Sequence, residues 1–256
     1  MIHSSAIIDP AARVADDVTV GPFSVIGPDV EIGSGSVIGS HVVVRGPTTI
    51  GQNNQIFQFA SVGEDPQDKK YNGEATRLEI GDNNVIREGC TLNRGTMQDR
   101  GVTSIGNGNL IMAYVHIAHD CIVKDNTILA NNVALAGHVT VEDFAILGGY
   151  TLVHQFCVIG PHAFTAMGSV LPKDVPPYVL VSGHMAKPFG LNVEGLKRRD
   201  FSSETIRDLR RAYKLIYKAG ISIEQASKQM RALNPASDEI ALLADFIEKS
   251  QRGIVR

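Results

Sequence analysis

The chain has 256 residues, enough for one large domain or for a domain with a smaller appendage, and its composition is that of a globular protein. Its 24 basic and 27 acidic residues leave a net charge of -3, which argues against a nucleic-acid-binding surface because such surfaces carry a basic excess. No stretch approaches the ~18 apolar residues of a membrane span, and the N-terminus lacks a basic segment followed by an apolar core. We therefore expect a cytoplasmic protein without stable membrane insertion.

From Ile2 onward, an aliphatic residue returns at every sixth position as far as Val62, and the series resumes over 80–92 and 105–171. Only Thr165 breaks it. Neither a helical period of 3.6 nor a strand alternation of two generates such a series. Hexapeptide repeats indicate a parallel β-helix, which we predict over residues 1–189 with three hexads in each coil of 18 residues. By analogy with hexapeptide-repeat proteins, we expect the coil to be left-handed.

The three cysteines lie in the position of the hexad that elsewhere holds Ala, Ser or Thr, namely Cys90, Cys121 and Cys157. Their number is odd, and their spacing is not that of metal ligands. We predict reduced cysteines that pack in the interior.

Two polar stretches interrupt the hexads, at about 63–79 and 97–104. A solenoid accommodates insertions as loops that leave one of its corners. The first stretch contains QDKKY (67–71), which supplies charges, donors and acceptors. It is either a surface excursion or an arm that completes a site on a neighbouring subunit.

After Pro172 the hexads fade, and we predict a small helical domain over residues 190–256. Its first helix begins after an N-cap at Ser202 and stops at Gly220. A second helix begins with the capping-box pattern that starts at Ser222 and ends before Pro235. A third covers about 238–251.

An 18-residue coil places residues whose numbers differ by 18 above one another, which gathers several histidines on one stripe. His119, Gly137 and Gln155 share a column, and Asp120 and His138 share the next. The imidazole of His119 suits a general base because its pKa is near neutrality. Asp120 could orient it, and the N–H of Gly137 could stabilise an oxyanion.

Zinc binding is the competing chemical reading of this stripe. His116, His119 and His138 could supply three imidazoles, as in a carbonic-anhydrase-like site on hexapeptide repeats. The Arg-x-Asp-x-Gly segment that would accompany such a site is missing, so we predict no metal.

Five segments together resemble the UDP-N-acetylglucosamine O-acyltransferases of the hexapeptide-repeat acyltransferase superfamily. They are QDKKY (67–71), HIAHDCIV (116–123), LANNVALAGHV (129–139), VHQFC (153–157) and NVEGLKRR (192–199). The likeness covers essentially the whole chain. It implies transfer of an (R)-3-hydroxyacyl group from the phosphopantetheine thioester of acyl carrier protein to the 3-hydroxyl of UDP-N-acetylglucosamine, the first step of lipid A biosynthesis, without another cofactor. It also implies a homotrimer with the site between subunits.

The resemblance assigns His119 as the base, Asp120 as its orienting partner and Gly137 as the oxyanion donor. It places the loop residues Gln67, Asp68 and Lys70 at the acyl donor, across a subunit boundary. The groove that holds sugar and donor is implied to contain His116, His138, His154 and Gln155, and the nucleotide contacts are implied to be Asn192, Glu194 and Arg198.

Two positions depart from the family pattern. Asn93 stands where a His commonly precedes Arg-Gly-Thr, which could alter the contact with the sugar. Met167 stands where some relatives have Gly, in a predicted column with Gly149 and Met185, so we predict that these methionines favour a shorter acyl chain. Two alternatives stay open: an N-acyltransferase that acts on a UDP-amino sugar, and a non-catalytic trimeric β-helix scaffold.

Overall fold

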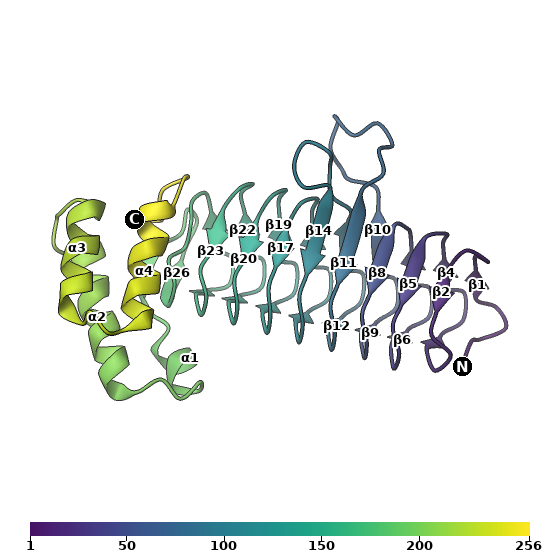
Figure 1. Cartoon of the computed structure of the whole chain (residues 1–256), viewed down its shortest axis with the longest axis horizontal. Coiled ribbons are helices and arrows are strands. Elements are labelled where there is room, and N and C mark those ends of the chain that lie inside the picture. The colour runs from purple at the N-terminus through teal and green to yellow at the C-terminus, as the bar shows by residue number, and fades with distance from the viewer.

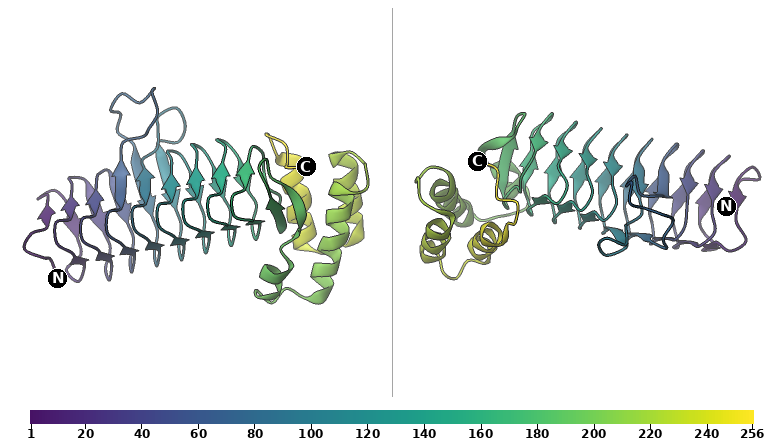
Figure 2. Two further views of the ribbon diagram at one scale, coloured as in Figure 1. Left: turned by 180° about the vertical axis from the view of Figure 1, so that it is seen from behind. Right: turned by 90° about the horizontal axis from the view of Figure 1, so that it is seen from above.

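The structure is a computed structural model that describes residues 1–256. It is an elongated prism of short parallel strands with helices packed at its C-terminal end (Figure 1). Two loops project from the prism near its middle, and both leave the same side (Figure 2).

Three sheets form the faces of the prism, and successive strands pass from one sheet to the next. The nine-stranded sheet contains β1 (Ile7–Ile8), β4 (Val25–Ile26), β7 (Val43–Val44), β10 (Ser61–Glu64), β13 (Thr91–Asn93), β16 (His116–Ile117), β19 (Ala134–Leu135), β22 (Leu152–Val153) and β25 (Val170–Leu171). The eight-stranded sheet contains β2 (Arg13–Val14), β5 (Val30–Ile32), β8 (Thr48–Ile50), β11 (Arg77–Ile80), β14 (Val102–Ile105), β17 (Ile122–Val123), β20 (Thr140–Val141) and β23 (Val158–Ile159). The ten-stranded sheet contains β3 (Thr19–Val20), β6 (Val37–Ile38), β9 (Gln55–Ile56), β12 (Val85–Ile86), β15 (Leu110–Ile111), β18 (Ile128–Leu129), β21 (Ile146–Leu147), β24 (Phe164–Thr165), β26 (Val179–Ser182) and β27 (Lys187–Leu191).

From Val20 onward the aliphatic residues of the hexads point into the prism, where they join one apolar core of 40 buried residues, and most of them are the last residue of a strand. The three cysteines are buried and unpaired, as the hexad position predicts. Thr165 replaces an aliphatic residue without leaving its hydroxyl unsatisfied, because its Oγ1 lies 2.7 Å from that of Thr151 and accepts the N–H of Gly148 at 3.0 Å.

The predicted columns are confirmed where the coils are regular. Ile122 pairs with Thr140, and Thr140 pairs with Val158, so equivalent residues recur every 18 positions. Each coil turns its corners through residues with positive φ, among them Asp120 (φ 60) and His138 (φ 64). The two lie one above the other at the edge between the nine-stranded and eight-stranded sheets.

The register changes in the last coil, and one predicted column is therefore wrong. Phe164 pairs with Leu180, so this coil is two residues shorter than the others. Met185 consequently does not lie in the column of Gly149 and Met167. The next strand, β27, pairs antiparallel with β26 and spans the predicted boundary at 189.

Four helices follow: α1 (Val193–Lys197), α2 (Ser203–Tyr217), α3 (Ile223–Leu233) and α4 (Asp238–Lys249). The predicted N-cap at Ser202 and the capping box of Ser222 with Gln225 are confirmed. The short α1 is an element that the apolar pattern does not predict. The helices enclose a second apolar core of 12 buried residues, and none of them combines the length and apolar character that crossing a bilayer requires.

Candidate active site

The site lies on the edge between the nine-stranded and eight-stranded sheets. Three successive coils turn there, and they carry His119 and Asp120 after β16, Gly137 and His138 after β19, and Gln155 after β22. Both projecting loops leave the same edge, since residues 65–76 connect β10 to β11 and residues 94–101 connect β13 to β14.

His119 and Asp120 form a close pair. Nδ1 of His119 lies 2.9 Å from Oδ2 of Asp120, whose side chain is fully buried, while the imidazole keeps 13% exposure. An ionised carboxylate at this distance holds the proton on Nδ1. The Nε2 atom is then left with its lone pair and can accept a proton.

The carboxylate of Asp120 is further fixed by Thr96 from the 94–101 loop. Thr96 donates its backbone N–H at 2.9 Å and its hydroxyl at 2.6 Å. Burial alone would raise the pKa of Asp120, but the hydrogen bonds with His119 and Thr96 outweigh burial and lower the pKa below its ordinary value. Thr96 has no repeat partner, so the sequence pattern gave no signal for it.

Gly137 lies directly beneath the imidazole of His119. A Cβ at this glycine would come within 2.5 Å of Cε1 of His119, so a side chain here would displace the histidine. The N–H of Gly137 donates to no acceptor within the protein. It is therefore available to a negatively charged oxygen near His119.

His138 stands beside this pair and is held by groups on three sides. Its ring is perpendicular to that of His119, with centroids 5.0 Å apart, and it stacks on Phe156 at 4.3 Å. Nδ1 of His138 contacts Oδ2 of Asp99 at 2.8 Å. Asp99 and Phe156 are site residues that sequence reasoning did not identify.

The other two histidines of the stripe form hydrogen-bond contacts with groups other than His119 and Asp120. Nδ1 of His116 lies 2.7 Å from Oγ1 of Thr91, and burial, followed by the nearby His119, lowers the pKa of His116. His154 is exposed, and its Nδ1 lies 3.2 Å from the carbonyl oxygen of Gln155.

A pocket of about 860 Å³ opens beside His119 and joins the corner residues to both loops. Its lining consists of residues 67–70 from the first loop, Gln98 and Asp99 from the second, and His119, His138, Gln155 and Phe156 from the corners. Gln67, Asp68 and Lys70 thus reach the site of their own chain. Their predicted contact across a subunit boundary stays a prediction.

The predicted nucleotide contacts lie on a different edge of the prism. Asn192 caps α1 and donates its side-chain N–H to the carbonyl of His162 at 3.0 Å, at the edge between the eight-stranded and ten-stranded sheets. Glu194 forms an exposed ion pair with Lys197 at 3.0 Å, and Arg198 ends the helix. Within one chain these residues do not line the pocket of His119.

The two methionines and Asn93 also lie outside this pocket. Met167 is 83% exposed and Met185 is 57% exposed. Asn93 is buried, and its amide donates to the carbonyl of Asp65 at 2.6 Å, so it contacts the base of the first loop.

The side chains do not assemble the three-histidine zinc site considered above. The group with ligand atoms within 4.8 Å of one another is His119, Asp120 and His138, and His116 does not belong to it. The carboxylate of Asp120 already accepts hydrogen bonds from His119 and Thr96, which leaves it poorly suited as a ligand.

Comparisons with known proteins identify the family. A protein from Thiobacillus denitrificans named acyl-[acyl-carrier-protein]--UDP-N-acetylglucosamine O-acyltransferase is 61% identical over 255 residues, which cover 100% of this chain and 99% of the relative. The chain belongs to the UDP-N-acetylglucosamine O-acyltransferase family. A family model described as UDP N-acetylglucosamine O-acyltransferase, domain 2, matches residues 174–255, and a bacterial transferase hexapeptide model matches 11–46 and 103–137.

Solved structures of UDP-N-acetylglucosamine O-acyltransferases have the same fold. LpxA from Acinetobacter baumannii is 55% identical with a TM-score of 0.97, covering 100% of this chain and 99% of its own. The Francisella novicida UDP-N-acetylglucosamine acyltransferase is 44% identical with a TM-score of 0.96, covering 100% and 94%. The predicted fold class, a left-handed parallel β-helix with a small C-terminal helical region, is confirmed.

Proposed function

We propose that this chain transfers an acyl group from acyl carrier protein to UDP-N-acetylglucosamine, in the first step of lipid A biosynthesis. The observation that carries the proposal is the imidazole of His119, held by the buried carboxylate of Asp120 directly above Gly137. A base beside a free backbone N–H is the arrangement that acyl transfer requires. The full-length relatives are named O-acyltransferases, which favours this reaction over N-acylation and over a scaffold.

In the proposed reaction, Nε2 of His119 takes the proton of the sugar 3-hydroxyl, and the oxygen attacks the carbonyl carbon of an (R)-3-hydroxyacyl thioester. Asp120 stabilises the imidazolium that forms, and the N–H of Gly137 donates to the oxyanion. The C–S bond then breaks, and the thiolate takes the proton from His119. His119 mediates both proton transfers, so the scheme requires no cofactor besides the phosphopantetheine thioester of the acyl donor.

The residues that line the pocket of His119 support several of the remaining site assignments. Gln67, Asp68 and Lys70 contact the acyl donor, and His138 and Gln155 border the reacting groups, because all five line the pocket of His119. We also assign His116 and His154 to this groove from the family resemblance, although neither lines the pocket of His119 within one chain. We assign the acyl length to Met167, with Met185 as a lesser contact since it lies outside that column.

Nucleotide binding by Asn192, Glu194 and Arg198 requires a second chain, since one chain places them on another edge than His119. A guanidinium suits a diphosphate better than an ammonium does, which supports the role of Arg198. We therefore propose a homotrimer with sites between subunits. The buried, unpaired cysteines support a cytoplasmic location, because disulfides are rare in reducing compartments.

The test is incubation of the protein with UDP-N-acetylglucosamine and a panel of hydroxyacyl carrier proteins, with mass analysis of the products. We expect an ester, a kcat that falls about 10²- to 10⁴-fold in His119→Ala, and a shift to longer chains in Met167→Gly. Lys228→Ala, at an exposed position of α3 away from the pocket of His119, is the control that keeps wild-type rates. Undiminished transfer by His119→Ala would refute the assigned base.

A further inference from the structure

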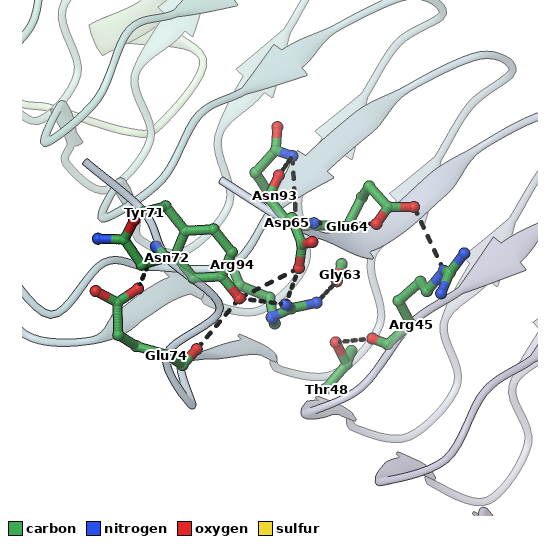
Figure 3. A network of polar contacts seen from close by, with 10 residues as sticks. All are labelled: Arg45, Thr48, Gly63, Glu64, Asp65, Tyr71, Asn72, Glu74, Asn93 and Arg94. Carbon is green, nitrogen blue, oxygen red and sulfur yellow. Dashed lines mark hydrogen bonds and ion pairs between the residues drawn. The ribbon is translucent and has the colours of Figure 1, made fainter. Parts of the chain in front are cut away.

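Arg94 is a buried cation at the start of the 94–101 loop, and it contacts three groups of the 65–76 loop and its base (Figure 3). Its side chain is 7% exposed. Nη1 donates to the carbonyl of Gly63 at 2.5 Å, while Nη2 pairs with the carboxylate of Asp65 and donates to the hydroxyl of Tyr71 at 3.0 Å. A buried charge is stable only with such partners.

The hydroxyl of Tyr71 extends this network across the loop. Its single hydrogen is shared between Oδ1 of Asp65 at 3.3 Å and the carbonyl of Glu74 at 3.2 Å. The carboxylate of Glu74 in turn accepts the N–H of Asn72 at 2.8 Å. The guanidinium of Arg94 therefore connects Asp65, the first residue of the loop, through Tyr71 to Glu74 near the end of the loop (Figure 3).

A bulge at Gly63 turns the chain outward at this point. Val62 pairs with Leu92, but the next paired residue is Glu64, opposite Asn93, so Gly63 is an extra residue in the strand. Gly63 has φ 78, and a Cβ there would lie 2.2 Å from the carbonyl oxygen of Arg45. The bulge exposes the carbonyl of Gly63, and the guanidinium of Arg94 donates to it.

Both loops held by Arg94 carry residues of the site. The 65–76 loop lines the pocket of His119 with residues 67–70. The 94–101 loop supplies Thr96 to Asp120 and Asp99 to His138. A shift of either loop would therefore change the pocket, although Arg94 contacts neither His119 nor Asp120.

We propose that Arg94, with Asp65 and Tyr71, is a positioning group for the reaction: it holds the 65–76 loop against the site so that Asp68 and Lys70 meet the acyl donor. This role rests on the proposed function. Arginine suits it because two nitrogens of the planar guanidinium divide the contacts, Nη1 with the carbonyl and Nη2 with the carboxylate and the hydroxyl, whereas an ammonium would have to make all three from one atom.

The test compares Tyr71→Phe, Asp65→Asn and Arg94→Lys by steady-state kinetics and by amide hydrogen exchange. We expect the KM for the acyl carrier protein to rise about tenfold in each, with kcat changed by less than about threefold, because the loop binds the donor and does not take part in proton transfer. Amides of the 65–76 loop should exchange faster. Arg45→Gln is the matched control, since Arg45 pairs with Glu64 at 3.4 Å but is 62% exposed and does not contact Arg94.

Tyr71→Phe loses a single oxygen and keeps the buried charge pair, so it separates the role of the loop from a failure to fold. An unchanged KM in folded Tyr71→Phe and Asp65→Asn, with an active wild-type protein, would overturn the positioning role even if exchange were faster. A wild-type protein without acyl transfer would overturn the proposed function itself. A KM increase that Arg45→Gln shares would also count against Arg94.

Discussion

Asp120 is a buried carboxylate whose charge is stabilised from two segments of the chain, the corner after β16 and the 94–101 loop. Burial raises its pKa, but the hydrogen bond with His119 and then those from Thr96 lower it below the ordinary value. An ionised Asp120 therefore contributes stability above the pKa of the unfolded chain. That contribution is lost as the pH falls through the lower pKa of the folded state.

Thr96→Val should weaken catalysis at low pH. Valine keeps the shape of the side chain and the backbone N–H, but it removes the hydroxyl donor 2.6 Å from Oδ2 of Asp120. The pKa of Asp120 should rise, so the acidic limb of the kcat profile should move to higher pH, and kcat at neutral pH should fall about tenfold.

The control for this change is Thr103→Val. The hydroxyl of Thr103 accepts the backbone N–H of Asp120 at 2.8 Å and does not contact the carboxylate. This variant should lose stability and keep the wild-type pH profile. An acidic limb that stays in place in Thr96→Val would show that Thr96 does not set the charge of Asp120.

The contacts between repeating coils could be predicted from the sequence, whereas the contacts that the two non-repeating loops make with those coils could not. The hexads placed Asp120 below His138 because hydrogen bonds between coils fix the register. Thr96 and Asp99 lie 24 and 39 residues from their partners, in a loop with no period. The predicted column of Met185 is wrong for a related reason, because nothing in the hexad pattern indicates that the last coil is shorter.

An aromatic stack joins the last coils to the helices. His162 lies between Phe144, at 4.9 Å, and Tyr178, at 5.7 Å, and Phe201 meets its edge at 5.0 Å. Nδ1 of His162 is buried without a hydrogen-bond partner. Burial, followed by the charge of Arg199, lowers the pKa of His162 to about 4 from an ordinary value of 6.5.

This stack should make the folded protein sensitive to acid. Below pH 6.5 the unfolded chain protonates His162 while the folded protein does not until about pH 4, so stability is lost as the pH falls across this window. His162→Phe should remove that loss, because phenylalanine fills the stack and leaves no polar atom unpaired. Melting temperatures from pH 7 to pH 4.5 would measure the effect.

His41→Phe is the matched control, since His41 stacks between Phe23 and Phe59 in the same way but is exposed. It should keep the wild-type dependence on pH. A His162→Phe protein whose melting temperature falls with acid as steeply as that of the wild type would show that another group is responsible.

On the scale of the whole molecule, the residues that we assign to the site are divided between edges of one prism. His119 and the two loops lie on one edge, and the residues around α1 lie on the next. Large aromatic side chains are exposed on the third edge, at Phe23, Phe59, Tyr114 and Tyr150. A stripe that follows the length of the prism favours association with another prism, and such association would bring different edges together.

Mixed trimers test this division. Neither His119→Ala nor Arg198→Ala should be active alone, but random trimers of the two should recover about one quarter of wild-type activity, because a site between chains can take His119 from one and Arg198 from the other. The control mixes His119→Ala with Asp120→Ala, which cannot complement because both groups must come from one chain at 2.9 Å. Mixed trimers that form by mass but stay inactive would show that His119 of one chain and Arg198 of another do not act together in one site.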